Sequence, residues 1–334
     1  MGKTARSACA ALSAACVLAG AAAGALAQDA PAYPARPIRF IVIFAPGGGL
    51  DIVGRLVADP LSARIGQPVI VENRPGAGGN IATGYAARST ADGHTLLVTT
   101  NSYNINAFLY RNPGYDARKD FAPVIELTAA ASIIIAHPGA PYRTVKDLVS
   151  AAQAQPGKIP YATGGNGSPT HIAAEMFKKA AGINLVHIPY KGGGPANQDV
   201  IAGQVPLAMA ALPPVMPHLL AGRLRGLAVT SDKRWPALAD VPTIAESGFP
   251  GYRHITWIGL VAPAATPRAV IARLNREIAA ILAEPDAAKR LQSDAAAPAP
   301  RYLTGGQIRQ AILGEPGACV SSGMKRLVQD SISG

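Results

Sequence analysis

The spacing of apolar residues along this chain changes repeatedly, and the changes predict strands followed by helices. Residues 37–44 are apolar apart from Arg39, which predicts a buried strand. Apolar residues at helical spacing within 51–65 predict a helix, with Asp51 as its N-cap. Strand–loop–helix units of this kind predict parallel sheets covered by helices on both faces, so the expected fold class is α/β.

The same pattern continues to residue 313. We expect further helices at 80–88, 144–154, 168–181, 195–202, 267–282 and 306–313. Asn80, Thr144 and Ser168 are expected N-caps, and Pro195 is expected to open its helix. We expect further strands at 68–73, 94–99, 132–136, 158–162, 185–189, 207–211, 227–230 and 257–262. A chain of 334 residues exceeds the usual size of one hydrophobic core, so we expect two lobes, with the C-terminal helices packed on the first.

The N-terminal segment has the pattern of a secretory signal peptide. Lys3 and Arg6 precede an uncharged, alanine-rich run that ends at Ala25-Leu26-Ala27, a small–x–small cleavage pattern. We therefore expect residues 1–27 to be removed and the mature chain to lie in the periplasm. A retained membrane anchor is the alternative, because the run is long enough to be considered.

The cysteines fit a secreted chain without disulfides. Cys9 and Cys16 lie in the expected signal peptide, and lipid attachment at Cys16 is disfavoured because Ser13 stands where an apolar residue is usual. Only Cys319 remains after cleavage, so an intrachain disulfide and a multi-cysteine metal site are both excluded.

Charge favours an anionic ligand over a nucleic acid. The chain carries a net charge of +11, which becomes +9 without residues 1–27 because that segment holds two basic residues and no acidic one. A positive field attracts anions. The basic residues are scattered and aromatic residues make up only 5% of the chain, so a nucleic-acid partner is not expected.

Three loops share one design, in which a strand ends, glycines follow and a helix begins. The loops are residues 46–51, 164–170 and 191–195. The first N–H groups of a helix lack intrahelical partners and carry the positive end of the helix dipole, so such loops suit a carboxylate or a phosphate. Tight turns alone would also explain the glycines of any single loop. Three such loops favour an anion site at the carboxyl edge of the sheets.

Other chemistries find little support. The nucleotide-binding pattern Gly-x-Gly-x-x-Gly fails because Ile52 and Thr170 stand in the last glycine position of the two nearest matches. His171 and Glu175 lie one helical turn apart, but no second cluster accompanies them, so neither a metal nor a cofactor is expected. We expect His171 to lie beside its glycine loop, either donating to a ligand or capping. Ser168 lacks the glycines of a nucleophile elbow.

The ordered motifs resemble the Bug-type receptors, the extracytoplasmic solute-binding components of tripartite tricarboxylate transporters. The resemblance extends over about residues 33–285. The motifs that carry it include Ala45-Pro46-Gly47-Gly48-Gly49-x-Asp51, Val71 to Gly79, Gly165-Asn166-Gly167-Ser168 with His171, His187-x-Pro189-Tyr190-Lys191-Gly192, and Asp240-Val241-Pro242-Thr243.

The resemblance implies a type II-like periplasmic binding protein, with two lobes joined by two crossing strands and a ligand cleft between them. We expect lobe 1 at residues 28–130 plus 254–334 and lobe 2 at 131–253. It also implies that a small organic carboxylate is held by loop backbone groups and bridging waters, that the chain is a monomer, and that membrane subunits of the transporter are its partners. The ligand-binding residues carried over are Gly47, Gly48, Leu50, Asp51, Thr100, Asn101, Ser102, Gly165, Asn166, Gly167, Ser168, Thr170, Tyr190 and Lys191.

Two departures from the family pattern bear on the ligand. Leu50 stands where a serine or threonine is common, which removes a hydroxyl from the first loop. Residues 206–211 lack the acidic residues that usually follow the Gly-x-Val turn. Two alternatives to a transport receptor stay open. One is a periplasmic ligand-sensing subunit for a membrane sensor, and the other is an α/β enzyme acting on a carboxylic acid, for which no nucleophile with a placed base is found.

Overall fold

The computed structural model describes residues 33–287 and 296–298. The expected signal peptide at 1–27, the expected helix at 306–313 and Cys319 lie outside the described residues. The strands are β1 (Ile38–Val42), β2 (Val69–Asn73), β3 (Thr95–Thr100), β4 (Phe121–Ala136), β5 (Pro160–Thr163), β6 (Val186–Pro189), β7 (Leu207–Ala211), β8 (Arg225–Val229), β9 (Ile255–Pro263) and β10 (Ala296–Pro298). The helices are α2 (Gly49–Ile65), α3 (Asn80–Ala87), α4 (Ser102–Leu109), α5 (Val145–Ala154), α6 (Pro169–Ala181), α7 (Gly193–Ile201), α8 (Leu212–Leu220) and α9 (Arg268–Ala283), with 3-10 turns η1 (Ala77–Gly79) and η2 (Pro236–Leu238).

One set of strands is built around β1. It pairs in parallel with β2 and β3, and β3 then pairs antiparallel with β9. Ile38, Phe40, Ile41 and Val42 are fully buried, as a strand covered on both faces requires. The helix α2 packs on this strand set, and α9 packs on α2 and β4.

A second set contains β5, β6, β7 and β8. The strands β5 and β6 are parallel, and β7 and β8 both pair antiparallel with the end of β4. Alternate residues of β4 enter different cores. Ile134 packs among residues of α5 and α6, whereas Ile133 and Ile135 pack among residues of α7 and α8. Both faces of this set are therefore buried, because side chains alternate across a strand.

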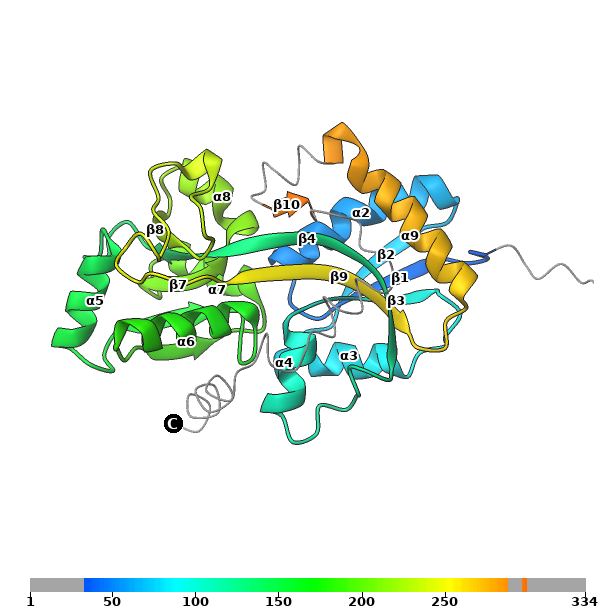
Figure 1. Ribbon diagram of the computed structural model, residues 1–334, viewed down its shortest axis with the longest axis horizontal. Helices are drawn as coiled ribbons and strands as arrows, with labels where there is room; N and C mark the ends of the chain where they lie inside the picture. Colours follow the sequence, from blue (N-terminus) through cyan, green and yellow to red (C-terminus); the bar gives the residue numbers. More distant parts are fainter. Residues whose placement is uncertain (1–32, 288–295, 299–334) are drawn as a thin grey trace, which may run out of the picture. The chain divides into compact units, whose positions relative to one another are not determined.

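The two sets are joined by β4 and β9, which run side by side in Figure 1. The first part of β4, from Phe121 to Ala131, pairs with β9, and Ser132 to Ala136 pairs with β7. Our prediction of a strand at 132–136 was therefore too short. Pro123, Glu126 and Thr128 interrupt the apolar run before it, so that part of β4 lacks a strand signal in the sequence. The antiparallel pairs of β4 and β9 also make the sheets mixed, where we expected parallel ones.

The predicted helix starts are confirmed where a side chain caps the helix. The Ser168 hydroxyl accepts from the N–H of His171 at the start of α6, and Thr144 forms a capping box at the start of α5. Two predicted N-caps are wrong, because Gly48 and Gly79 cap α2 and α3 in place of Asp51 and Asn80. The start predicted at Pro195 is also wrong, since α7 begins at Gly193.

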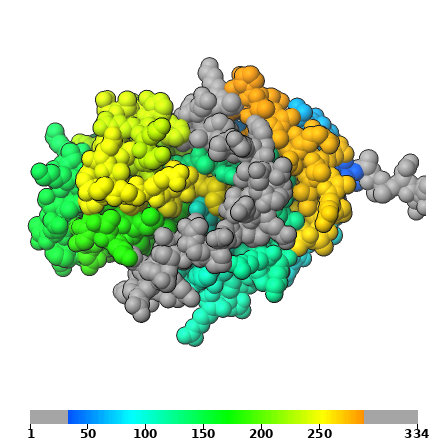
Figure 2. Space-filling model, viewed as in Figure 1, coloured from blue at the N-terminus to red at the C-terminus, as the bar shows by residue number. Residues whose placement is uncertain are grey.

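The C-terminal helix α9 packs as expected on the β1 set. Leu274, Ile278, Ile281 and Leu282 are buried along one side of it, while its outer side forms part of the surface in Figure 2. The Asn275 amide donates to the carbonyl of Val124 in β4 at 2.7 Å. Within the described ranges, no helix is both long and apolar enough to cross a bilayer.

Candidate functional site

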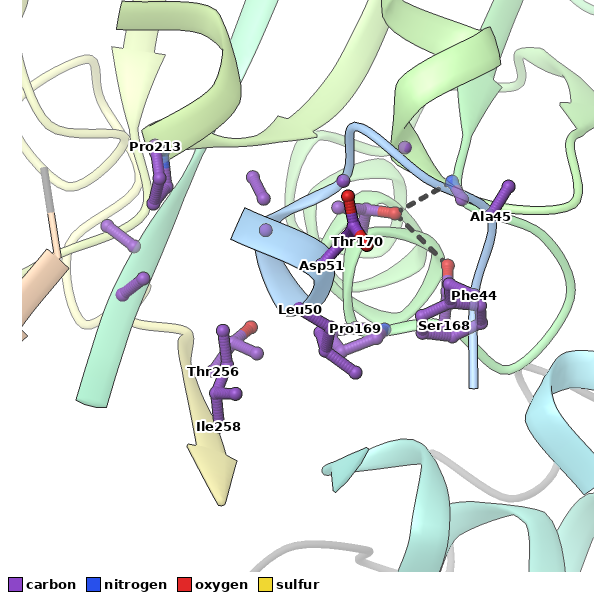
Figure 3. A pocket seen from close by; sticks show the side chains of 17 residues that line it. Phe44, Ala45, Leu50, Asp51, Ser168, Pro169, Thr170, Pro213, Thr256 and Ile258 are labelled. Carbon is purple, nitrogen blue, oxygen red and sulfur yellow. Dashed lines mark hydrogen bonds between the residues drawn. The ribbon is translucent and has the colours of Figure 1, made fainter. Parts of the chain in front are cut away.

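The three glycine loops meet at one small cavity. They follow β1, β5 and β6, and they precede α2, α6 and α7. The cavity has a volume of about 50 Å³, enough for a few water molecules at about 10–15 Å³ each. Figure 3 shows the side chains that surround it. The lining residues are Phe44, Ala45, Gly48, Gly49, Leu50, Asp51, Ala130, Ala131, Gly164, Ser168, Pro169, Thr170, Gly193, Ala211, Pro213, Thr256 and Ile258.

The first loop is held by a carboxylate in the first turn of α2. The Asp51 side chain accepts from the N–H of Gly47 at 3.0 Å and from the guanidinium of Arg55 at 3.0 Å. Burial raises the pKa of Asp51, but the hydrogen bonds from Arg55, Gly47 and Asn73 outweigh it and leave the pKa below its usual value. Asp51 therefore reaches back from the third helical position, which is why Gly48 takes the N-cap position in its place.

The second loop is held by neutral side chains. Thr170 accepts from the N–H of Gly164, and Thr163 accepts from the N–H of Gly165. Nδ1 of His171 accepts from the N–H of Gly167 at 3.2 Å. Several backbone donors of this loop are thus already occupied by its own side chains, which fixes the loop's shape.

A buried pair of histidines lies behind the second loop. The rings of His171 and His187 stack with their centroids 4.2 Å apart, and Nε2 of His187 hydrogen-bonds with the Thr163 hydroxyl. Burial lowers the pKa of His171 to about 4 and that of His187 to about 3. Both rings are therefore neutral at pH 7, and Nδ1 of His171 is available as an acceptor. His171 lies beside the loop, as expected, and its role there is to accept from the loop backbone.

The third loop contacts the first across the site. The N–H of Ala45 donates to the carbonyl of Lys191 at 3.1 Å. A Cβ placed on Gly194 would lie 2.2 Å from the carbonyl oxygen of Pro46. The glycine at position 194 is therefore what lets the start of α7 approach the first loop so closely.

A second hollow, of about 180 Å³, adjoins the cavity. It shares Phe44 and Gly164 with the cavity. Its lining residues are Phe44, Gly76, Ala77, Gly78, Tyr110, Gly164, Gly165, Asn166, Pro189, Tyr190 and Lys191.

The predicted site residues fall into three groups. Gly48, Leu50, Asp51, Ser168 and Thr170 line the cavity. Gly165, Asn166, Tyr190 and Lys191 line the adjoining hollow. The lining of neither includes Gly47, Thr100, Asn101, Ser102 and Gly167.

Three of the remaining residues sit at the carboxyl end of β3. Thr100 donates its hydroxyl proton to the carbonyl of Trp257, and Asn101 accepts from the N–H of Trp257 at 3.2 Å. Ser102, which follows them, is fully buried. Thr100 and Asn101 therefore fasten β3 to β9.

The residues missed by the sequence reasoning lie on the opposite wall. Ala130 and Ala131 come from β4, and Thr256 and Ile258 come from β9. Ala211 and Pro213 come from the junction of β7 and α8. Single residues inside strands carry no local motif, so only the crossing strands implied by the resemblance pointed to this wall. In the part of the chain that the structure describes, no group of three or more His, Cys, Asp and Glu residues could hold a metal.

Two α/β strand sets, two crossing strands and a cavity at helix N-termini define a solute-binding receptor of the two-lobe periplasmic type. The model of the tripartite tricarboxylate transporter family receptor, TctC, matches residues 53–304. The chain belongs to that family, and the resemblance to Bug-type receptors is confirmed.

Individual relatives agree with this family. A UPF0065 protein encoded in the tcbD-tcbE intergenic region of Pseudomonas sp. (strain P51) is 38% identical over 281 residues, which are 83% of this chain and 84% of the relative. The structure of R. palustris Rpa4515 with adipate superposes with a TM-score of 0.84 at 34% identity, covering 89% of this chain and 98% of that one. The periplasmic binding protein BugD has a TM-score of 0.78 at 32% identity, with 90% and 97% covered.

Proposed function

We propose that this chain captures a small carboxylate in the cavity and delivers it to the membrane subunits of a tripartite transporter, without converting it chemically. Its family is named for the receptors of such transporters, and a solved relative at 34% identity is described with adipate, a dicarboxylate. Two similar solved structures, one described as a periplasmic transporter and one as the periplasmic binding protein BugD, support a periplasmic location. The cleaved signal peptide at 1–27 and a monomeric state belong to this proposal.

The observation that carries the proposal is the convergence of three helix N-termini on one cavity. Gly49 of α2, Thr170 of α6 and Gly193 of α7 all line it. The first N–H groups of each helix have no intrahelical acceptor, and the three dipoles place positive potential in the same volume. A carboxylate there would accept hydrogen bonds from the backbone without a cationic side chain.

We further propose lobe 1 at residues 28–130 plus 254–334 and lobe 2 at 131–253. Support comes from β4, which pairs with β9 up to Ala131 and with β7 from Ser132 onward. The contact between Ala45 and Lys191 and the approach of Gly194 to Pro46 then join the two lobes. In this proposal the described arrangement is the closed one, and opening requires those loops to separate about β4 and β9.

Mass spectrometry of the solute released from natively purified protein tests the proposal directly. We expect a small organic acid, and the same acid should raise the melting temperature in a thermal-shift assay. Gly48→Val places methyl groups between the first loop and the start of α7, since a Cβ there would lie 3.6 Å from the Gly193 nitrogen. This variant should fold but lose the ligand-induced shift. Release of a neutral or cationic solute would contradict the proposal.

A further inference from the structure

The cavity has two unlike ends, and the difference bears on what the solute must look like. The starts of α2, α6 and α7 lie at one end, where we propose that the carboxylate binds. The other end is formed by the crossing strands and by the start of α8. The groups at this second end determine which chemical groups the rest of the solute can carry. The inference rests on the proposed function, because it takes the carboxylate to lie at the first end.

The second end is apolar. Ala130, Ala131 and Ile258 come from the crossing strands, and Ala211 and Pro213 complete the wall. Leu50 adds a further apolar side chain from α2. Figure 3 shows Thr256 and Ile258 projecting from β9 toward the side on which Leu50 and Pro169 lie. Such a surface stabilises hydrocarbon by removing it from water.

Thr256 is the exception within this wall. The residue is only 8% exposed, it lines the cavity, and its hydroxyl oxygen has no hydrogen-bond partner in the structure. A buried hydroxyl without a partner is unfavourable, and buried polar groups are normally satisfied. A solute atom that hydrogen-bonds to Oγ1 of Thr256 would remove that cost.

The other polar side chains around the cavity already have partners. The Asp51 carboxylate accepts from Gly47 and Arg55. The hydroxyls of Ser168 and Thr170 hydrogen-bond with each other at 3.0 Å and also accept from backbone N–H groups. Among the described residues that line the cavity there is no Lys, Arg or His. A second anionic group on the solute would therefore be buried beside apolar groups, neutral hydroxyls and the Asp51 carboxylate, with no cation in the lining to pair with it, which is strongly unfavourable.

We propose that the solute of this receptor is a monocarboxylate with a compact apolar body and one neutral hydrogen-bonding group, such as a ketone or a hydroxyl, bound to Thr256. Dicarboxylates of the same length are discriminated against. The neutral group sits where a dicarboxylate would place its second charge.

Calorimetry with shape-matched acids tests this proposal. The acids are succinate, 4-oxopentanoate (in which a methyl group replaces one carboxylate oxygen of succinate) and pentanoate, together with the corresponding trios that span three to six carbons between the ends. In the best-binding trio we expect the oxo acid to bind at least about tenfold more tightly than the dicarboxylate, because the second charge lacks a cation. It should also bind about three- to tenfold more tightly than the plain acid, as one hydrogen bond implies.

A matched pair of variants assigns the effect to Thr256. Thr256→Val should abolish the preference for the oxo acid over the plain acid, because valine has the same shape but no hydroxyl to bond the ketone oxygen. Thr266→Val is the control, because Thr266 is also a buried residue whose hydroxyl has no partner, and it does not line the cavity. That variant should keep both preferences.

Three outcomes would overturn one proposal or both. If a dicarboxylate binds as tightly as its oxo analogue or more tightly, the inference is wrong and the proposed function stands. If Thr256→Val leaves the preference for the oxo acid unchanged, the role of Thr256 is wrong. If no acid of any trio binds, the proposed function fails together with the inference.

Discussion

The first and second glycine loops follow the same sequence design, but different chemistry holds them. The loop before α2 depends on one charged group, the Asp51 carboxylate, which binds Gly47 and Arg55. The loop before α6 depends on neutral acceptors, chiefly Thr170, Thr163 and His171. Glycine content alone therefore does not say how a loop is held or how it responds to pH.

Because of this difference, we expect the first and second loops to have different roles at the cavity. The second loop has its Gly164, Gly165 and Gly167 amides bound to its own side chains, so it acts as a rigid wall. The first loop is fastened at Gly47 and faces the start of α7. We therefore expect ligand-dependent movement to separate the first and third loops, while the second keeps its shape.

The largest effect should come from blocking that approach. Gly194→Ala puts a Cβ 2.2 Å from the Pro46 carbonyl oxygen, which the described arrangement of the first and third loops cannot accommodate. Affinity for the best-binding acid should fall by at least about a hundredfold, which corresponds to about 3 kcal/mol. Isothermal titration calorimetry measures this loss.

Gly193→Ala is the matched control for this prediction. Its Cβ would lie no closer than 4.0 Å to its nearest neighbour, Gly48. Affinity should fall by no more than about tenfold, because the added methyl group reaches the cavity that Gly193 lines but does not block the approach of the loops. Equal losses in the two variants would show that the start of α7 needs glycine for some reason other than the approach of the loops.

The second prediction uses pH to separate the two loops. Burial lowers the pKa of His171 to about 4 from an ordinary value of 6.5. Between these values the unfolded chain binds a proton that the folded chain does not, so stability falls as the pH drops from about 6.5 to 4, by up to ~3 kcal/mol for this residue. The pKa of Asp51 is lowered from 3.8, so its contribution persists throughout that range and is lost only at more acidic pH.

His171→Asn distinguishes this contribution from those of other groups. The asparagine oxygen can still accept from the N–H of Gly167, but the side chain no longer titrates. Chemical denaturation at a series of pH values should show a shallower loss of stability between pH 6.5 and 4 in the variant. His187 and His254, whose pKa values burial also lowers, should maintain part of the slope. Identical slopes in the two proteins would exclude His171 as a source of the effect.

The sequence predicted these loops far better than the wall that faces them. Ser168 and Thr144 cap their helices through hydroxyls whose pattern is local, so both starts were predicted correctly. The prediction for Asp51 was wrong because an acidic residue reaching back from the third helical position has the same sequence pattern as an N-cap. The two correct N-cap predictions and the wrong one all concern interactions between residues that are close together in the sequence.

The opposite wall depends on tertiary pairing. Most of β4 was missed because its strand character comes from its pairing with β9 rather than from an apolar run. The helix α8 was missed because Pro213, Pro214 and Pro217 read as breakers, although two of them lie in the first helical turn, where proline is tolerated. Thr256 has no local motif, and its place in the cavity lining, not its burial, distinguishes it from the equally buried Thr95, Thr99 and Thr100 of β3.

The third prediction removes the charged fastening of the first loop. Asp51→Ala leaves the Gly47 N–H and the Arg55 guanidinium without their acceptor, which should cost about 1–3 kcal/mol of folding free energy. Asp51→Asn keeps an oxygen for Gly47 and should lose roughly half as much. Urea denaturation at pH 7 measures both. If the two variants are equally unstable, the charge itself rather than the acceptor geometry holds the loop.

The smallest effect should come from the cap of the second loop. Ser168→Ala removes the acceptor of the His171 N–H and the partner of the Thr170 hydroxyl, and should cost about 1 kcal/mol of stability. Thr144→Ala removes the cap of α5, far from the lining of the cavity, at a similar cost. Because Ser168 lines the cavity and Thr144 does not, the first variant should also weaken acid binding several-fold, while the second should leave it unchanged. Equal affinities in the two variants would mean that the hydrogen bonds of the Ser168 hydroxyl stabilise only the fold. The shape of the second loop would then play no part in binding the solute.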